Sequence, residues 1–121
     1  MTKHSPTVID VKNLDDAKKA IKDVGSDPDS IEIMAPKMVL RVVKLKNVVL
    51  QDAIIIKQDM LSLGGEVAVP KETFDLYEKS ADILVIGNLK QLEELTDKLR
   101  RHYPRLKKIA DELSTFLKDI K

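Results

Sequence analysis

Four segments of the chain repeat apolar residues every three or four positions, the spacing of a helix with one buried face. They run over residues 14–24, 50–63, 89–103 and 104–121. Asn13 can cap the first helix, Gly25 and the pair Gly64-Gly65 can end the first and second, and Pro104 suits the first turn of the last. The pattern therefore predicts four helices.

Shorter apolar runs predict strands at residues 31–34, 39–45, 66–69 and 82–86, and a turn at 26–30. The run Ile83-Leu84-Val85-Ile86 has no polar alternation. Such a run indicates a strand buried on both faces, as in a parallel sheet. Because strands and helices alternate along the chain, right-handed crossovers are expected. We predict a single compact α/β domain with about four mostly parallel strands and helices packed on the sheet.

The chain has 121 residues, the size of one ordinary domain. Residues 1–12 are predicted to form an N-terminal tail, with a short strand at Val8-Ile9 as one option. Residues 13–121 then make the domain. The helix over 104–121 is its most detachable element, and its apolar stripe suits either the sheet or a helical contact with a second copy.

Charge and composition exclude several functional classes. Lys plus Arg is 21 and Asp plus Glu is 20, so the net charge of +1 disfavours a globally basic nucleic-acid binder. The absence of cysteine excludes disulfides, zinc–thiolate sites and iron–sulfur clusters. Since no apolar run approaches the ~20 residues of a membrane span, a cytoplasmic protein without a membrane partner is expected.

Catalytic motifs are missing from the sequence. His4 and His102 lie in no zinc-binding spacing, no serine lies in a Gly-x-Ser-x-Gly elbow, and no glycine-rich phosphate loop occurs. We therefore assign no catalytic residue, no metal and no cofactor, and favour a binding module over an enzyme.

Lys57 breaks the amphipathic pattern of the helix over 50–63. At about 100° per residue it falls inside the apolar arc, between Ala53 and Leu61, while Ile55 falls in the polar arc. A buried ammonium is costly unless it is paired or reaches water. Two interpretations stay open: the Lys57 head reaches solvent at the sheet edge, or it faces an anionic group on a ligand or partner.

Two further places carry candidate binding residues. Gly87, Asn88 and Lys90 stand where a strand end becomes a helix N-terminus, which attracts anions, although plain capping by Asn88 accounts for the same residues. The second is a basic run over 98–108 that interleaves Tyr103 and suits phosphate contacts or a solvated helix surface. Its cations include Arg100, Arg101, Arg105, Lys107 and Lys108.

Three stretches resemble a known family. They are Ile33-Met34-Ala35-Pro36-Lys37, the string from Lys57 to Val69 (KQDMLSLGGEVAV), and Gly87-Asn88-Leu89-Lys90-Gln91. In this order and spacing they resemble the N-terminal extension of some archaeal and bacterial dihydropteroate synthases, over about residues 15–110.

That resemblance implies a stand-alone accessory domain linked to folate or methanopterin synthesis. It would bind a pterin or phosphate-bearing ligand, and its partner would be a pterin-pathway protein or a second copy. The implied ligand residues are Lys37, Lys57, Gly65, Gly87, Asn88 and Lys90. The synthase reaction itself is not implied, because 121 residues cannot hold a barrel of about 250. The alternative is a nucleic-acid-binding or protein-assembly module that uses residues 98–108, with nucleic acid the less favoured partner.

Overall fold

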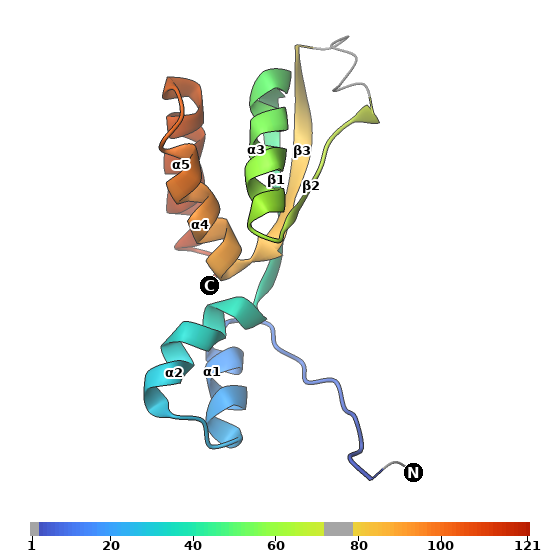
Figure 1. Cartoon of the computed structure of the whole chain (residues 1–121), viewed down its shortest axis with the longest axis vertical. Helices are drawn as coiled ribbons and strands as arrows, with labels where there is room; N and C mark the ends of the chain where they lie inside the picture. Colours follow the sequence, from blue (N-terminus) through green and yellow to red (C-terminus); the bar gives the residue numbers. More distant parts are fainter. Residues whose placement is uncertain (1–2, 72–78) are drawn as a thin grey trace.

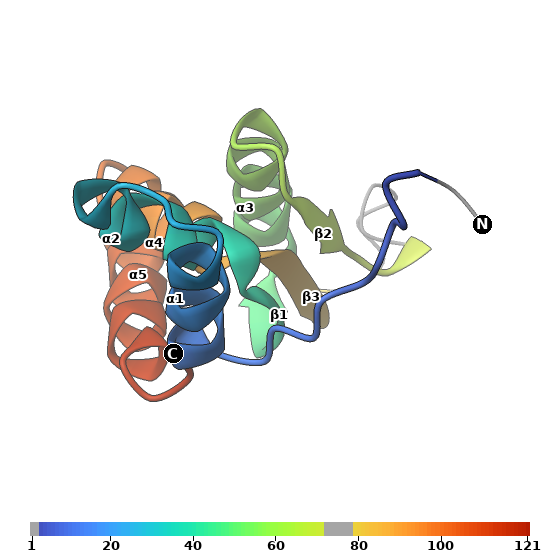
Figure 2. The ribbon, with the colours of Figure 1, turned by 90° about the horizontal axis from the view of Figure 1, so that it is seen from below.

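The structure, a computed structural model, describes residues 3–71 and 79–121 (Figures 1 and 2). No helix within these ranges is both long and apolar enough to cross a membrane. The described elements follow in this order: α1 (Leu14–Asp23), α2 (Pro28–Met34), the 3₁₀ helix η1 (Ala35–Met38), β1 (Leu40–Val49), α3 (Leu50–Ser62), β2 (Glu66–Ala68), β3 (Ser80–Asn88), α4 (Leu89–Leu99) and α5 (Pro104–Leu117).

Most of the predicted elements are confirmed. The four predicted helices appear as α1, α3, α4 and α5, and three of the predicted strands appear as β1, β2 and β3. The side chain of Asn13 caps α1 as expected, by accepting from the backbone N of Asp16 at 2.9 Å. Residues 3–12 form no helix or strand, and Val8 and Ile9 are exposed, so the optional strand at these residues is absent. Residues 1 and 2 of the predicted tail lie outside the described residues.

The prediction of about four mostly parallel strands is wrong. The described strands form one sheet in the order β1-β3-β2, and β3 is antiparallel to both neighbours. The apolar run in β3 misled the interpretation, because Ile83 and Val85 are buried while Leu84 is 38% exposed. Only one face of the sheet is therefore buried, which antiparallel sheets tolerate and parallel sheets seldom do.

The predicted strand at residues 31–34 is also wrong, because these residues belong to α2. Asp27 caps this helix by accepting from the backbone N of Asp29, and Pro28 occupies its first turn. The alternation of Ile31 and Ile33 with polar residues fits a strand. The residues that start the helix, Asp27 and Pro28, lie in the predicted turn at residues 26–30.

The main core lies between the buried sheet face and the helices α3, α4 and α5. Figures 1 and 2 show α4 and α5 side by side, next to α3 and the sheet. The largest fully buried side chains of this core are aliphatic: Ile56, Met60, Ile83, Leu92, Leu95, Leu99, Leu106 and Leu113. A smaller cluster joins α1 and η1 to the start of α4 through Ala17, Ile21, Ala35, Val39 and Leu89. Only 3% of the chain is aromatic, so the core is built almost entirely from aliphatic side chains.

A β-bulge interrupts β1 near its end. Leu45 pairs with Ile83 and Val48 pairs with Ala81, so β1 holds one residue more than β3 across this interval. Asn47 lies in the bulge with φ of 55°, and its backbone N donates to Asp82 Oδ1 at 3.1 Å. Asn tolerates this left-handed conformation better than most residues. The bulge keeps both Leu45 and Val48 on the inner face of the sheet.

Arg41 holds the two ends of the folded region together. Its Nη2 donates to Lys12 O at 2.8 Å, and its Nε donates to Ile120 O at 3.0 Å. Beside it, the backbone N of Leu14 donates to Lys121 O at 2.8 Å. The first turn of α1 therefore lies against the last residue of the chain.

Two glycines make room for Met60, which is fully buried. A Cβ atom at Gly87 would lie 2.5 Å from Met60 Cε. A Cβ atom at Gly65 would lie 2.8 Å from the same atom and 2.7 Å from the backbone O of Ile86. The side chain of Met60 thus occupies the space that side chains at these two positions would take.

We expect Gly65→Ala to cost more stability than Gly87→Ala. The first methyl group meets backbone, which cannot yield, whereas the second meets the end of a flexible side chain. Overpacking of this kind costs roughly 1–3 kcal/mol. We therefore expect the free energy of unfolding to fall by about 3 kcal/mol in Gly65→Ala and by about 1 kcal/mol in Gly87→Ala, as measured by urea denaturation. In a Met60→Leu background, which removes Cε, the Gly87→Ala penalty should shrink more than the Gly65→Ala penalty, because the clash of the Gly65→Ala methyl group with Ile86 O remains. A Gly65→Ala protein as stable as the wild type would contradict this account.

Candidate functional site

Part of the polar arc of α3 faces other helices of the protein. The arc comprises Gln51, Asp52, Gln58, Asp59 and Ser62, of which Gln51 and Gln58 are exposed. The sheet covers one side of α3, and the junction of α4 and α5 covers another, so polar residues of α3 pair with side chains from that junction. Ile55, which falls in the polar arc, is half-buried and packs against the main core. Its position is therefore explained by packing rather than by an external contact.

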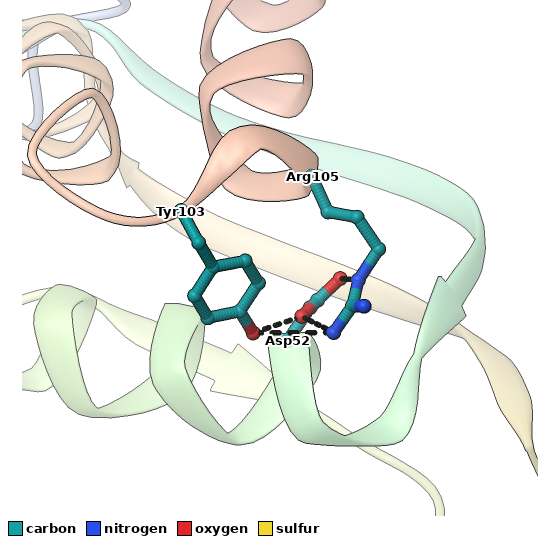
Figure 3. A network of polar contacts seen from close by, with 3 residues as sticks. All are labelled: Asp52, Tyr103 and Arg105. Atoms are coloured by element: carbon teal, nitrogen blue, oxygen red, sulfur yellow. Dashed lines mark hydrogen bonds and ion pairs between the residues drawn. The ribbon is translucent and has the colours of Figure 1, made fainter.

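A buried carboxylate, Asp52, anchors this junction (Figure 3). Only 1% of Asp52 is exposed. Arg105 donates to both of its oxygens, from Nε to Oδ2 and from Nη2 to Oδ1, each at 2.9 Å. Tyr103 donates its hydroxyl to Oδ1, and the Arg105 guanidinium stands 4.9 Å from the centre of the Tyr103 ring. All these contacts join the first turn of α3 to the start of α5.

The pKa values of the network follow from these contacts. Burial raises the pKa of the Asp52 carboxyl, but hydrogen bonds from Arg105 and Tyr103, with the guanidinium charge, hold it below its ordinary value. Burial and the Asp52 carboxylate raise the pKa of the Tyr103 hydroxyl. The carboxylate likewise raises the pKa of Arg105. At neutral pH the network is thus an ion pair with a neutral tyrosine.

Three further polar contacts continue along α3. His102 Nε2 lies 3.0 Å from Asp59 Oδ2, and Lys98 Nζ donates to Ser62 Oγ at 2.8 Å. At the end of the helix, Gln91 Nε2 donates to Leu63 O at 3.1 Å. Three residues of the polar arc, Asp52, Asp59 and Ser62, are therefore paired with α4, the start of α5 and the segment between them.

Lys57 connects α3 to the edge strand β2. Its Nζ donates to Val67 O at 2.8 Å and to Glu66 Oε1 at 3.4 Å, and 28% of its side chain is exposed. Glu66 in turn accepts from the backbone N of Val67 at 2.8 Å. This hydrogen bond, with Lys57, holds the pKa of Glu66 below its usual range. The head of Lys57 thus lies at the edge of the sheet, as the first of the two interpretations expected.

Most of the other candidate ligand residues also have contacts within the protein. Gly65 and Gly87 flank Met60, and the side chain of Asn88 accepts from the backbone N of Gln91 at 2.8 Å in a capping box. Lys90 Nζ lies 3.6 Å from Glu94 Oε1, and Lys37 is exposed at the end of η1. Packing explains the two glycines, capping explains Asn88 and an ion pair engages Lys90, whereas none of these applies to Lys37 among the described residues. The ligand role of all these residues stays a prediction.

The basic run over 98–108 is partly used inside the protein. Arg105 pairs with Asp52, and Arg100 approaches Asp97 and Asp111, each at 3.6 Å. Arg101, Lys107 and Lys108 are exposed and have no ion-pair partner among the described residues. Fewer cations are therefore free for a phosphate backbone than the run suggests, and a nucleic-acid or assembly role stays a prediction.

A pocket of about 350 Å³ opens beside the Asp52 network, between the β1 bulge and α5. Its lining includes Lys46, Asn47, Arg105, Lys108 and Glu112. Asn47, Asp52 and Glu112 are not among the candidate residues that the sequence indicated. No motif marks them, because the pocket forms between a bulge and a helix about 60 residues apart. Across residues 3–71 and 79–121, no three His, Asp or Glu side chains gather as a metal site requires.

The chain is similar to part of a folate-pathway enzyme. It is 32% identical over 106 residues to a bifunctional dihydropteroate synthase/dihydropteroate reductase from Helicobacter pylori. The match covers 88% of this chain but only 28% of that protein. No protein-family profile and no solved structure matches the chain. The comparison supports a relation between this chain and dihydropteroate synthases.

We expect Asp52→Asn to destabilise the protein at neutral pH by about 2 kcal/mol, less than a fully buried ion pair because Arg105 stays half-exposed. The lowered pKa makes this stabilisation complete above the unfolded value of about 4, and it is lost as pH falls through the lower folded value. The difference in melting temperature between wild type and Asp52→Asn should therefore shrink below about pH 4. A difference independent of pH from 7 to 2 would show that the charge is not what stabilises the junction.

Proposed function

We propose that this chain is an accessory, ligand-binding domain of folate or methanopterin synthesis, equivalent to the non-barrel part of extended dihydropteroate synthases. The observation that carries the proposal is the similarity to the bifunctional enzyme over 88% of the chain. The proposed ligand is a pterin or a phosphate-bearing compound, and the proposed partner is a pterin-pathway protein or a second copy.

The lengths of the two proteins support this assignment. The match takes up 28% of the relative, which leaves about 270 of its residues outside the match. A synthase barrel needs about 250 residues. The relative therefore has room for a complete barrel beside the matching region, and 121 residues have room for none.

The arrangement of the motif residues also supports an accessory role. Lys57 pairs with β2, the two glycines flank Met60, and Asn88 caps α4. A general acid, base or nucleophile needs a group that is free to meet a substrate. These residues are engaged in holding the fold, which favours a binding or supporting domain over a catalytic one.

The second candidate is the reductase activity named for the relative. If the barrel supplies the synthase reaction, the reductase reaction is left for the remaining part of that protein, which includes the matching region. Reduction of dihydropteroate takes a hydride and a proton, so a nicotinamide or a reduced flavin would have to be supplied as the donor.

We expect pterins or their phosphates to raise the melting temperature of the wild-type chain. A ligand that binds only the native state at 100 times its Kd stabilises it by about 2.7 kcal/mol. The measurement is a thermal-shift series with pterin, hydroxymethylpterin diphosphate and inorganic pyrophosphate. A shift that disappears in a folded Lys57→Met variant would assign the ligand to the motif residues. A shift that the variant retains would show that Lys57 does not bind the ligand and serves only in the contact with β2. No shift with any compound would count against the proposal.

We expect the chain alone not to consume NADH or NADPH in the presence of dihydropteroate, with or without added flavin. The nicotinamide absorbance is followed over time, with a reaction lacking dihydropteroate as the control. Consumption that depends on dihydropteroate and scales with protein concentration would replace the accessory role with the reductase role.

A further inference from the structure

A groove runs between β1 and α5, away from the three motif stretches at residues 33–37, 57–69 and 87–91. The pocket of about 350 Å³ forms one end of it, and a second pocket of about 250 Å³ adjoins the first. Leu45 and Glu112 line both pockets and mark the middle of the groove. Together the two volumes fall in the range of small-molecule sites, which is about 300–1,000 Å³.

The groove is cationic at one end and apolar at the other. Lys46 and Lys108 line only the larger pocket, with Arg105 in the same wall. Val43, Leu113 and Phe116 line only the smaller one, and Phe116 is 46% exposed. Lys44 also lines the smaller pocket, but its Nζ lies 3.7 Å from Asp82 Oδ2, so its charge is balanced. Because Asp52 balances the charge of Arg105, the two lysines of the larger pocket outweigh the single carboxylate of Glu112. This distribution suits a ligand with an anionic group and a flat apolar body.

Two charged residues of α5 that line the groove have no partner among the described residues. Lys108 and Glu112 are four residues apart on one helix face, a spacing at which opposite charges commonly pair. Neither has an ion-pair or hydrogen-bond partner among the residues that the structure describes. The rise of the helix separates them by about 6 Å along its axis. Together they offer a cation and a hydrogen-bond acceptor to a ligand in the groove.

The Asp52 network fixes a third donor at the cationic end. Arg105 uses Nε and Nη2 on Asp52, and the structure gives Nη1 no partner among the described residues. Its guanidinium is therefore held in place on the pocket wall by a buried carboxylate. A donor fixed in advance loses less side-chain entropy when an anion binds.

We propose that the groove between β1 and α5 binds a small, flat aromatic anion, with the anionic group at Lys108 and Arg105 and the ring between Leu45 and Phe116. On the proposed function, which this assignment of the ligand rests on, the compound is a pterin phosphate. The amino-amide edge of a pterin carries two adjacent N–H donors, which match the two oxygens of one carboxylate. Glu112 then recognises the ring, and the cations recognise the phosphate.

The test is calorimetric titration of the full chain and four surface variants. The ligands are hydroxymethylpterin diphosphate, phosphate-free hydroxymethylpterin and anilinonaphthalene sulfonate, an aromatic anion that is not a pterin. Lys108→Met and Glu112→Gln change the proposed site. Lys107→Met and Asp111→Asn are matched controls, because these residues are exposed neighbours on α5 that do not line either pocket.

We expect Lys108→Met to weaken diphosphate binding by about 10-fold and to leave phosphate-free pterin within about 2-fold. Glu112→Gln should weaken both pterins by about 10-fold, because an amide accepts only one of the two donors. Lys108→Met should also weaken the sulfonate, and the controls should match the wild type.

The outcomes separate the groove from the proposed function. If the wild type and all four variants bind the pterin diphosphate equally well, the assignment of the ligand to the groove is wrong, and the proposed function still stands. Sulfonate binding that depends on Lys108, without any pterin binding, would uphold the groove as an aromatic-anion site and count against the proposed function. No binding of any ligand to the wild type would overturn both.

Discussion

The position of α5 depends on the buried carboxylate of Asp52. An ionised carboxylate that is 1% exposed costs several kcal/mol unless it is paired and hydrogen-bonded. Arg105 and Tyr103 supply that pairing from the start of α5. The network therefore ties the start of α5 to the first turn of α3, which follows β1 directly. Along the rest of α5, the buried residues Leu106, Ala110, Leu113 and Leu117 hold the helix on the core. One end of the groove thus lies beside a polar anchor.

The synthase-like segments and the groove belong to different parts of the molecule. Lys57, Gly65 and Gly87 lie where α3 meets the sheet, and their contacts bind one element to another. The groove residues Lys108 and Glu112 lie on α5. Similarity at Lys57, Gly65 and Gly87 to the synthases indicates that these elements pack together in the same way in both proteins. It supports a shared fold with the bifunctional enzyme, whereas a ligand has to be argued from groups that remain free.

Sequence patterns predicted the elements well, and their spatial relations poorly. Helical periodicity located α1, α3, α4 and α5, because each buries one apolar stripe. It did not predict that α3 would bury Asp52 from its polar arc, since Asp52 finds its partners about 50 residues further along the chain. The run in β3 was ambiguous for a similar reason. The presence of an apolar residue such as Leu84 does not reveal whether its face of the sheet is covered or exposed.

The contacts of Arg41 have a consequence for how this unit fits into longer polypeptides. Arg41 binds a carbonyl from each end of the folded region, and Leu14 bonds to Lys121. A chain that enters and leaves at one point can be inserted into a host protein, or circularly permuted, with a short linker and a small loop-closure cost. The same geometry lets such a unit be gained or lost by gene fusion without disturbing the fold on either side of the junction.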